Sequence, residues 1–313
     1  MTRAFAILLL CLVAQPLECQ SAINPSSPTQ PPAPTQSQVA AGGKMMFEAA
    51  SIRKDTSGKF KPPSFALNAD DGLPPRDGMF YADFPLIVYI QFAYKQWFTP
   101  EETRSLYAGL PKWVVTDTYE IHAQGKGKPS KDQVRLMMQS LLADRFGLQV
   151  HFESRQLAVF VMTLIKPGKT GPRLRPHTLT CDTAPSANVP LPGEVFPPRC
   201  LDQALMTIPK PNHVKLTGTR NTTLALIATY LPSIGELDRP VLDETGLSGR
   251  YDFSLEFTPD SSLPVPSGAD AEPDAQATTF HEALAAQLGL QLKPAKAPRD
   301  VLVIDRVERP DEN

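Results

Sequence analysis

Five histidines are the residues of this sequence best suited to bind a metal ion or to transfer protons in catalysis. They are His122, His151, His177, His213 and His281. No two of them stand at the H-x-x-x-H spacing that places two imidazoles on one helix face, as a zinc peptidase requires. The sequence therefore predicts no zinc site, and no metal or other cofactor is expected.

Three further short patterns carry residues that could do chemistry. Residues 246–249 (GLSG) lack the second spacer of the nucleophile motif G-x-S-x-G and precede a predicted strand, which favours a β-turn. Residues 125–128 (GKGK) have neither dinucleotide-loop nor Walker spacing, so a basic turn is favoured over an anion site. His151 and Arg155 could form a small anion-binding pair, although a solvated strand end is the simpler interpretation. No catalytic residue is predicted.

Four aromatic residues form the best candidate for a ligand-binding patch. Trp97, Phe98, Tyr107 and Trp113 lie close together in the sequence, between a predicted helix and the strand at 119–123. Aromatic side chains at such a connection more often pack into a core or an interface than stack on a ligand. Packing is therefore the favoured interpretation, and a ligand patch is the alternative.

One helix is specified at both of its ends. Ser130 and Gln133 form the capping box S-x-x-Q, and apolar residues recur at helical spacing from Val134 to Phe146. Gly147 then supplies the left-handed residue that ends a helix. Strands are expected at 148–152 and 157–165, joined as a β-hairpin through Glu153-Ser154-Arg155-Gln156.

The same segment recurs near the end of the chain. The tripeptide GLQ at 147–149 corresponds to GLQ at 289–291. Thr279 and Glu282 form a second capping box, and Gly289 is the second helix stop. The sequence thus contains two copies of a capped helix followed by strands.

Shorter helices and strands complete the two copies. Asp83 is expected to cap a helix at 86–94, with Pro85 in its first turn, and Asn221 or Thr222 is expected to cap a helix at 224–231. The prediction is an α+β protein of two duplicated β-α-β-α-β-β units. Each unit, over 45–167 and 212–313, is a small sheet packed by two helices.

Composition limits the classes of function that remain. The chain has 313 residues, of which 42% are hydrophobic and 20% are charged, and its net charge is −2. A folded core is therefore expected, in one large domain or two small ones. Because neither sign of charge dominates, binding to nucleic acid is not expected.

The N-terminus predicts export to the periplasm or the extracellular space. Arg3 precedes an apolar run at 4–14 that is too short to cross about 30 Å of hydrocarbon, so residues 1–22 are interpreted as a signal peptide. A lipid anchor at Cys19 is disfavoured because Glu18 stands where a small residue is expected. Residues 23–44 form a Pro/Ser/Thr-rich linker. No transmembrane segment is expected in the mature chain.

Two late cysteines predict a disulfide. Cleavage of the signal peptide would leave Cys181 and Cys200, an even pair in an oxidising compartment. Closing a loop of roughly 20 residues would stabilise the fold by about 3 kcal/mol in the chain-entropy description. Residues 168–211, rich in proline and glycine, are accordingly interpreted as a disulfide-clipped connection between the two repeats.

Several sequence blocks carry a family resemblance. The distinctive blocks are FEAASIRK (47–54), GLPKW (109–113), YEIHAQ (119–124), LLADRFGLQVHFESRQLAVFVM (141–162), RPVLDETGLSGRYDF (239–253) and VLVIDRVERPDEN (301–313). They resemble a large family of exported proteins of soil acidobacteria (Solibacter-type), classed as a domain of unknown function. The resemblance covers about 45–313. It implies fold, compartment and lineage, and it supplies no catalytic residues.

The predicted function is binding rather than catalysis. The repeated pattern is similar to the short N-terminal modules of secretins and TonB-dependent receptors, an analogy that favours an interaction role. We expect a non-catalytic extracytoplasmic binding or protein-interaction module, whose partner is a protein or another component of the cell envelope. The alternative is an extracytoplasmic hydrolase with a site assembled between the two halves.

Overall fold

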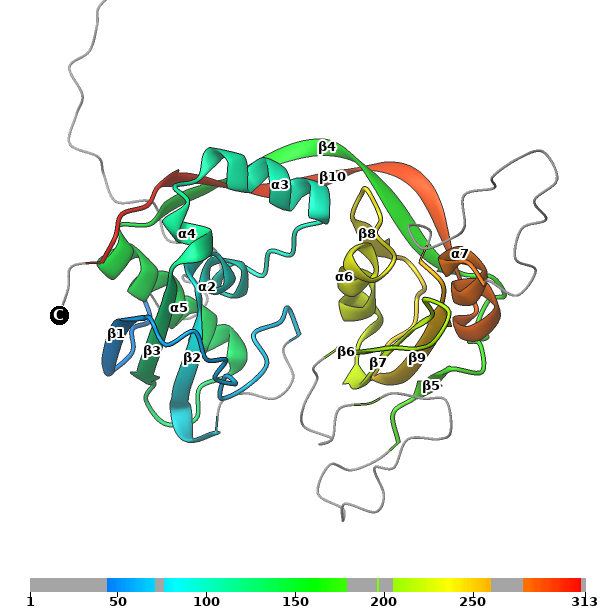
Figure 1. The fold of residues 1–313 in the computed structure, drawn as a ribbon, viewed down its shortest axis with the longest axis horizontal. Coiled ribbons are helices and arrows are strands. Elements are labelled where there is room, and N and C mark those ends of the chain that lie inside the picture. The colour runs from blue at the N-terminus through cyan, green and yellow to red at the C-terminus, as the bar shows by residue number, and fades with distance from the viewer. Residues whose placement is uncertain (1–43, 71–75, 179–195, 197–204, 260–277, 311–313) are drawn as a thin grey trace, which may run out of the picture. The chain divides into compact units, whose positions relative to one another are not determined.

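The computed structural model describes residues 44–70, 76–178, 196, 205–259 and 278–310. These residues form a mixed α/β structure with three small sheets, which is compatible with the predicted α+β class (Figure 1). The elements in chain order are β1 (Ala49–Asp55), η1 (Arg76–Gly78), β2 (Met79–Pro85), α2 (Leu86–Ala93), α3 (Pro100–Gly109), α4 (Trp113–Thr116), β3 (Thr118–Gln124), α5 (Lys131–Phe146), β4 (Gln149–Leu164), β5 (Leu174–Pro176), β6 (Met206–Pro209), β7 (Lys215–Thr222), α6 (Leu224–Ile234), β8 (Val241–Asp243), β9 (Tyr251–Phe257), α7 (Phe280–Ala283), η4 (Leu284–Leu288) and β10 (Leu290–Arg306).

Some predictions fall on residues outside the described ranges. These are the signal peptide at 1–22, almost all of the linker at 23–44, the possible anchor at Cys19, and the disulfide between Cys181 and Cys200. The domain boundaries of the two repeats stay predictions. Among the described helices, none is both long and apolar enough to cross a membrane.

The first sheet has the strand order β1-β3-β2, with both pairs antiparallel. Ile121 lies between Ile52 and Ala82, so this row faces the helices, while Glu120 and Asp83 in the next row face the other side. The apolar face packs against α2 and α5 to make the first core. Its largest buried members are Phe80, Leu86, Tyr89, Ile90, Phe92, Ile121, Met138 and Phe146.

The second sheet has the order β5-β9-β7-β6 and is also antiparallel. Helix α6 and the segment formed by α7 and η4 cover it and close the second core. Phe257 of β9 meets Phe280 of α7 in an edge-to-face contact with ring centroids 5.2 Å apart. Further buried members are Leu224, Ile227, Leu231, Phe253, Leu255, Leu284 and Leu288.

Strands β4 and β10 form a long antiparallel ribbon, with β8 added parallel to β4. The predicted hairpin through residues 153–156 is wrong, because these residues continue β4 and pair with residues 298–301 of β10. A distant strand supplies the backbone partners that a local turn would have supplied. Pro294 and Pro298 are tolerated within β10 because it is an edge strand of its sheet.

The two predicted capping boxes are confirmed. Ser130 Oγ accepts a hydrogen bond from the Gln133 amide at 3.2 Å, and Thr279 Oγ1 accepts one from the Glu282 amide at 3.3 Å. Gly147 ends α5 in the left-handed conformation, with φ 55°. These local patterns were readable because a cap satisfies backbone groups only a few residues away.

Two other predicted caps are wrong. Asp83 lies within β2, and Pro85 stands at the N-cap of α2 without a side-chain hydrogen bond. Neither Asn221 nor Thr222 caps α6; Thr223 does, its Oγ1 accepting from the Leu226 amide at 3.2 Å. In both places the preceding strand continues further than expected, because sheet pairing competes with the helix for the same residues.

A close backbone approach gives a prediction about stability. The Gly171 amide donates to the Leu288 carbonyl at 2.8 Å, and a Cβ on residue 171 would lie 2.4 Å from the Gln287 carbonyl oxygen. We expect Gly171→Ala to lower the free energy of unfolding by about 1–3 kcal/mol, measured by urea denaturation. The control Gly109→Ala meets no atom within 4 Å and is expected to change it by less than about 1 kcal/mol. Equal loss in both variants would contradict this packing.

Candidate functional site

A groove lies between helix α3 and the ribbon, and we call it the ribbon groove. It encloses about 330 Å³, which is at the small end of the range typical for small-molecule sites. Apolar side chains from both the helix and the ribbon give it a hydrophobic interior. Its lining residues are Gln96, Phe98, Glu102, Leu106, Gly109, Leu110, Arg155, Leu157, Arg299, Asp300, Val301, Leu302, Val303 and Ile304.

The helical wall of the groove is fixed by a complete N-terminal cap. Pro100 stands in the first turn of α3, where its missing amide hydrogen costs nothing. Thr99 Oγ1 accepts from the Glu102 amide at 3.1 Å, and Glu102 Oε2 accepts from the Thr99 amide at 2.8 Å. Leu106 and Leu110 pack at the edge of the first core and also line the groove. The wall is therefore held by both a cap and a core contact.

The floor of the groove comes from the ribbon. Leu302 of β10 is buried in the first core, with 3% of its surface exposed, and Ile304 packs against the same core. Leu157 of β4 is half-buried and belongs to the lining. Because these strands are paired along their length, the floor is preorganised by backbone hydrogen bonds.

Two arginines stand at the rim of the groove. Arg155 of β4 lies directly opposite Arg299 of β10 in the strand register. Arg155 donates from Nε and Nη2 to Glu153 Oε2 at 2.9 and 2.6 Å, and half of its side chain is exposed. Arg299 donates from Nη1 to Glu102 Oε1 at 3.4 Å. The rim is therefore charged, whereas the interior is apolar.

The predicted aromatic patch is divided between different surroundings. Phe98 lines the ribbon groove and, with Trp97, a neighbouring cavity of about 90 Å³. Tyr107 and Trp113 instead pack against the first core, where Trp113 meets Tyr119 with ring centroids 6.4 Å apart. A shared ligand-binding patch, the alternative to packing for these four residues, stays untested.

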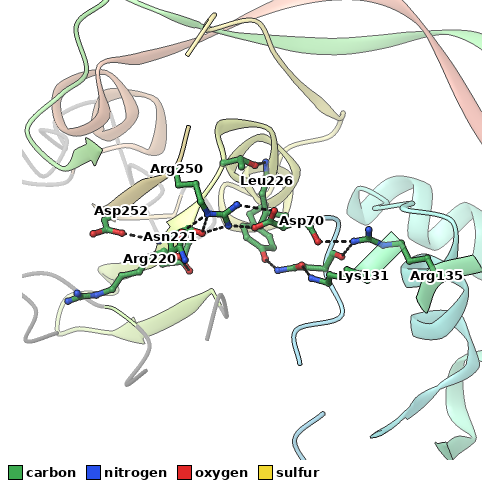
Figure 2. Close-up of polar contacts among 12 residues, drawn as sticks. Asp70, Lys131, Arg135, Arg220, Asn221, Leu226, Arg250 and Asp252 are labelled. Atoms are coloured by element: carbon green, nitrogen blue, oxygen red, sulfur yellow. Dashed lines mark hydrogen bonds and ion pairs between the residues drawn. The ribbon is translucent and has the colours of Figure 1, made fainter. Parts of the chain in front are cut away.

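A polar network connects α5 with the end of the second sheet (Figure 2). Arg135 donates from Nη2 to the carbonyl oxygens of Asn68 and Asp70, at 2.9 and 2.8 Å. Lys131 donates from Nζ to Asn68 Oδ1 at 2.5 Å. Lys131 and Arg135 are 1% and 2% exposed. Buried cations require such polar partners, so these contacts hold residues 68–70 against α5.

The other half of the network lies where β7 ends and β9 begins (Figure 2). Arg250 donates from Nη2 to Asp70 Oδ2 and to the carbonyl oxygen of Asn221. The Asn221 amide donates to Asp252 Oδ1 at 2.9 Å, and His177 Nδ1 lies 2.7 Å from the same oxygen. Each carboxylate thus has a donor or a cation beside it. This arrangement favours a structural anchor over a reactive centre.

A second charged cluster covers the polar face of the first sheet. Lys61 Nζ lies 2.9 Å from Glu120 Oε2, 3.4 Å from Asp83 Oδ2 and 3.7 Å from Asp55 Oδ2. The Asp83 side chain is 1% exposed, and its Oδ1 has no hydrogen-bond partner among the described residues. Lys61 occupies the space between the carboxylates, so the cluster ties the segment around residue 61 to the sheet.

The two aspartates of this cluster have opposite pKa shifts. Burial, and then the neighbouring Asp55 carboxyl, raises the pKa of Asp83. Hydrogen bonds from the backbone and hydroxyl of Ser57 lower the pKa of Asp55 to about 2. The hydrogen bond from Lys61 to Glu120 raises the pKa of Lys61. At neutral pH the fold therefore favours an ionised Asp55 and opposes an ionised Asp83.

The histidines do not assemble into a metal site in the described part of the chain, where no three His, Cys, Asp or Glu residues gather suitably. His151 Nδ1 lies 2.9 Å from Asp305 Oδ1, and its Nε2 lies 3.2 Å from Glu153 Oε1. Glu153 also binds Arg155, so a carboxylate stands between His151 and Arg155. The alternative that these two residues together bind an anion is therefore disfavoured, because Glu153 contacts both of them.

Helix α3 and both charged clusters were not predicted from the sequence. The helix carried a readable signal, since Thr99, Pro100 and Glu102 form a capping box with proline in the first turn. The two charged clusters have no signal in the sequence, because their residues come from distant segments and have no characteristic spacing. Only the folded topology brings them together.

Comparison with known proteins identifies one family. A family model described as a protein of unknown function (DUF3738) matches residues 88–307, which include every residue that lines the ribbon groove. The predicted domain of unknown function is thereby confirmed, whereas the acidobacterial lineage stays a prediction. No curated protein and no solved structure matches the chain.

The opposite pKa shifts predict opposite effects of two matched substitutions. Because ionisation of Asp83 costs stability as pH rises from about 4 towards its raised folded pKa, Asp83→Asn should be at least as stable as the wild type at neutral pH. Asp55→Asn should be less stable at neutral pH, and this loss should vanish as the pH falls through about 2. Urea unfolding across this pH range measures both. Equal destabilisation by both variants at neutral pH would contradict the assignment.

Proposed function

The chain belongs to the DUF3738 family of proteins of unknown function, and we propose that it is an exported, non-catalytic binding protein whose ligand occupies the ribbon groove. The observation that carries the proposal is a preformed groove of about 330 Å³ with an apolar interior and a charged rim. Such a combination is typical of sites that bury the apolar part of a small molecule and orient its polar part.

The interior of the groove supports binding of an apolar group. Leu106 of α3 and Leu110 at its C-cap face the same space as Leu157 and Val301 from the ribbon. Removing apolar surface from water contributes roughly 25 cal/mol per Å². A ligand that fills the groove would therefore gain affinity without any strongly polar contact.

The residues that line the groove support a non-catalytic role. Among the described residues that form it, there is no histidine, cysteine, serine, threonine or lysine, so the lining has no thiol, hydroxyl, amine or imidazole, and its titratable groups other than arginine are the carboxylates of Glu102 and Asp300. Glu102 and Arg299 contact each other, and Arg155 contacts Glu153. The alternative of a hydrolase between the halves has weaker support, because the carboxylates of Asp70 and Asp252 already accept hydrogen bonds from Arg250 and the Asn221 amide.

We also infer that the two halves are copies of one ancestral unit. The first sheet has the strand order β1-β3-β2, and the second sheet contains the matching order β5-β9-β7. A helix follows β2 in the first half and β7 in the second half. A capped helix then leads into β4 in one half and into β10 in the other.

The proposal that the protein is exported rests on the apolar run at residues 4–14. Detection of a mature N-terminus near residue 22 in the culture or periplasmic fraction would support it.

The groove is tested by binding of N-phenylnaphthylamine, a neutral apolar dye that fluoresces when it is buried. We expect the wild type to bind the dye, and we expect Leu157→Glu and Leu106→Glu to weaken binding at least about tenfold, because each places a charge in the apolar interior. Circular dichroism of each variant checks that it is folded.

The matched control is Ile208→Glu on β6, since Ile208 is 44% exposed and does not line the groove. This variant should bind the dye as the wild type does. The proposal fails if the wild type does not bind the dye. It also fails if the groove variants bind it as tightly as the control.

A further inference from the structure

The register of the ribbon places two like charges against each other. Arg155 and Arg299 are directly opposite in an antiparallel pair, so their side chains leave the ribbon on the same face. Like charges in this position repel and destabilise the strand pairing. Both residues also line the ribbon groove. Each arginine is paired with a carboxylate of the chain, Arg155 with Glu153 and Arg299 with Glu102, so the two guanidinium groups mark a place where carboxylates bind.

The two arginines differ in how closely they contact their carboxylate partners within the chain. Arg155 makes a close, two-atom contact with Glu153, at 2.9 and 2.6 Å. Arg299 reaches Glu102 at 3.4 Å, which is longer than an ordinary N–H···O hydrogen bond. Glu102 is also held at Oε2 by the Thr99 amide, so it cannot move freely towards Arg299. Asp300 follows Arg299 along β10 and also lines the groove.

We propose that the ligand of the ribbon groove is a small amphiphile with an unbranched apolar chain and a carboxylate head, which Arg155 and Arg299 bind at the rim. This inference rests on the proposed function of the groove and adds the chemistry of its ligand. A guanidinium group presents paired N–H donors that match the two oxygens of a carboxylate. The contact between Arg299 and Glu102 shows that a carboxylate oxygen reaches this position.

The arginines at the rim and the apolar interior of the groove then contact different parts of the ligand. The chain lies among Leu106, Leu157 and Val301, where a charge would be costly. The head lies at the rim, where 23% of Arg299 and 51% of Arg155 remain exposed and a partly solvated carboxylate is stable. An alcohol of the same chain length would gain only the first contribution, and an amine would be repelled by the arginines.

The test is displacement of bound N-phenylnaphthylamine by decanoate, decanol and decylamine, each kept below its micelle concentration. We expect decanoate to displace the dye at a concentration at least about tenfold lower than decanol, since hydrogen bonds to charged groups exceed those between neutral groups. Decylamine should be the weakest competitor. Arg155→Gln and Arg299→Gln should each reduce the preference for decanoate and leave displacement by decanol unchanged.

The matched control is Arg306→Gln, because Arg306 is an exposed arginine of the same strand that pairs with Glu308 and does not line the groove. It should keep the full preference for decanoate. If decanol competes as well as decanoate, or decylamine competes best, the carboxylate head is refuted while the groove remains a binding site. If the dye does not bind the wild type at all, the proposed function and this inference both fail.

Discussion

The backbone pairing of β4 with β10 is the interaction on which the rest of this structure depends. One end of the ribbon contributes Met162 and Leu290 to the second core, and the other contributes Leu302 to the first core. Because side chains alternate between the two faces of a strand, a slip of one residue would turn both sets of apolar side chains outward. The two cores together therefore fix one register.

That register also creates the candidate site. It sets Arg155 opposite Arg299 and presents residues 299–304 to helix α3. The helix is held in turn by the capping box of Thr99 and Glu102. The groove thus follows from two constraints, the long-range register of the ribbon and the local cap of α3. In the proposed function, the charged rim and the apolar interior favour molecules that have both a charged and an apolar part.

The sequence revealed the elements whose determinants are local. The capping boxes at Ser130 and Thr279 and the glycine stop at Gly147 were predicted correctly, because each involves backbone groups within one helical turn. The continuous strand at 149–164 was not predicted. The polar residues at 153–156 resemble a turn when they are viewed alone, and their partner strand lies near the far end of the chain.

The candidate site was only hinted at by the sequence. Phe98 was noted as part of an aromatic patch and does line the groove, but no pattern connected it with Leu157 or Arg299. Their proximity follows from the strand register and from the placement of α3, and both are features of the tertiary structure. The same reason explains Asp83, which was expected to cap a helix and instead lies buried beside Lys61.

Hydrogen–deuterium exchange of the full chain, with and without decanoate, tests most directly whether the ribbon groove is the ligand site. A ligand held there should slow exchange of backbone amides in α3 and in residues 299–304 of β10, and should leave the first and second sheets unchanged. Protection confined to the sheets, or no protection at all at saturating decanoate, would contradict the assignment of the groove.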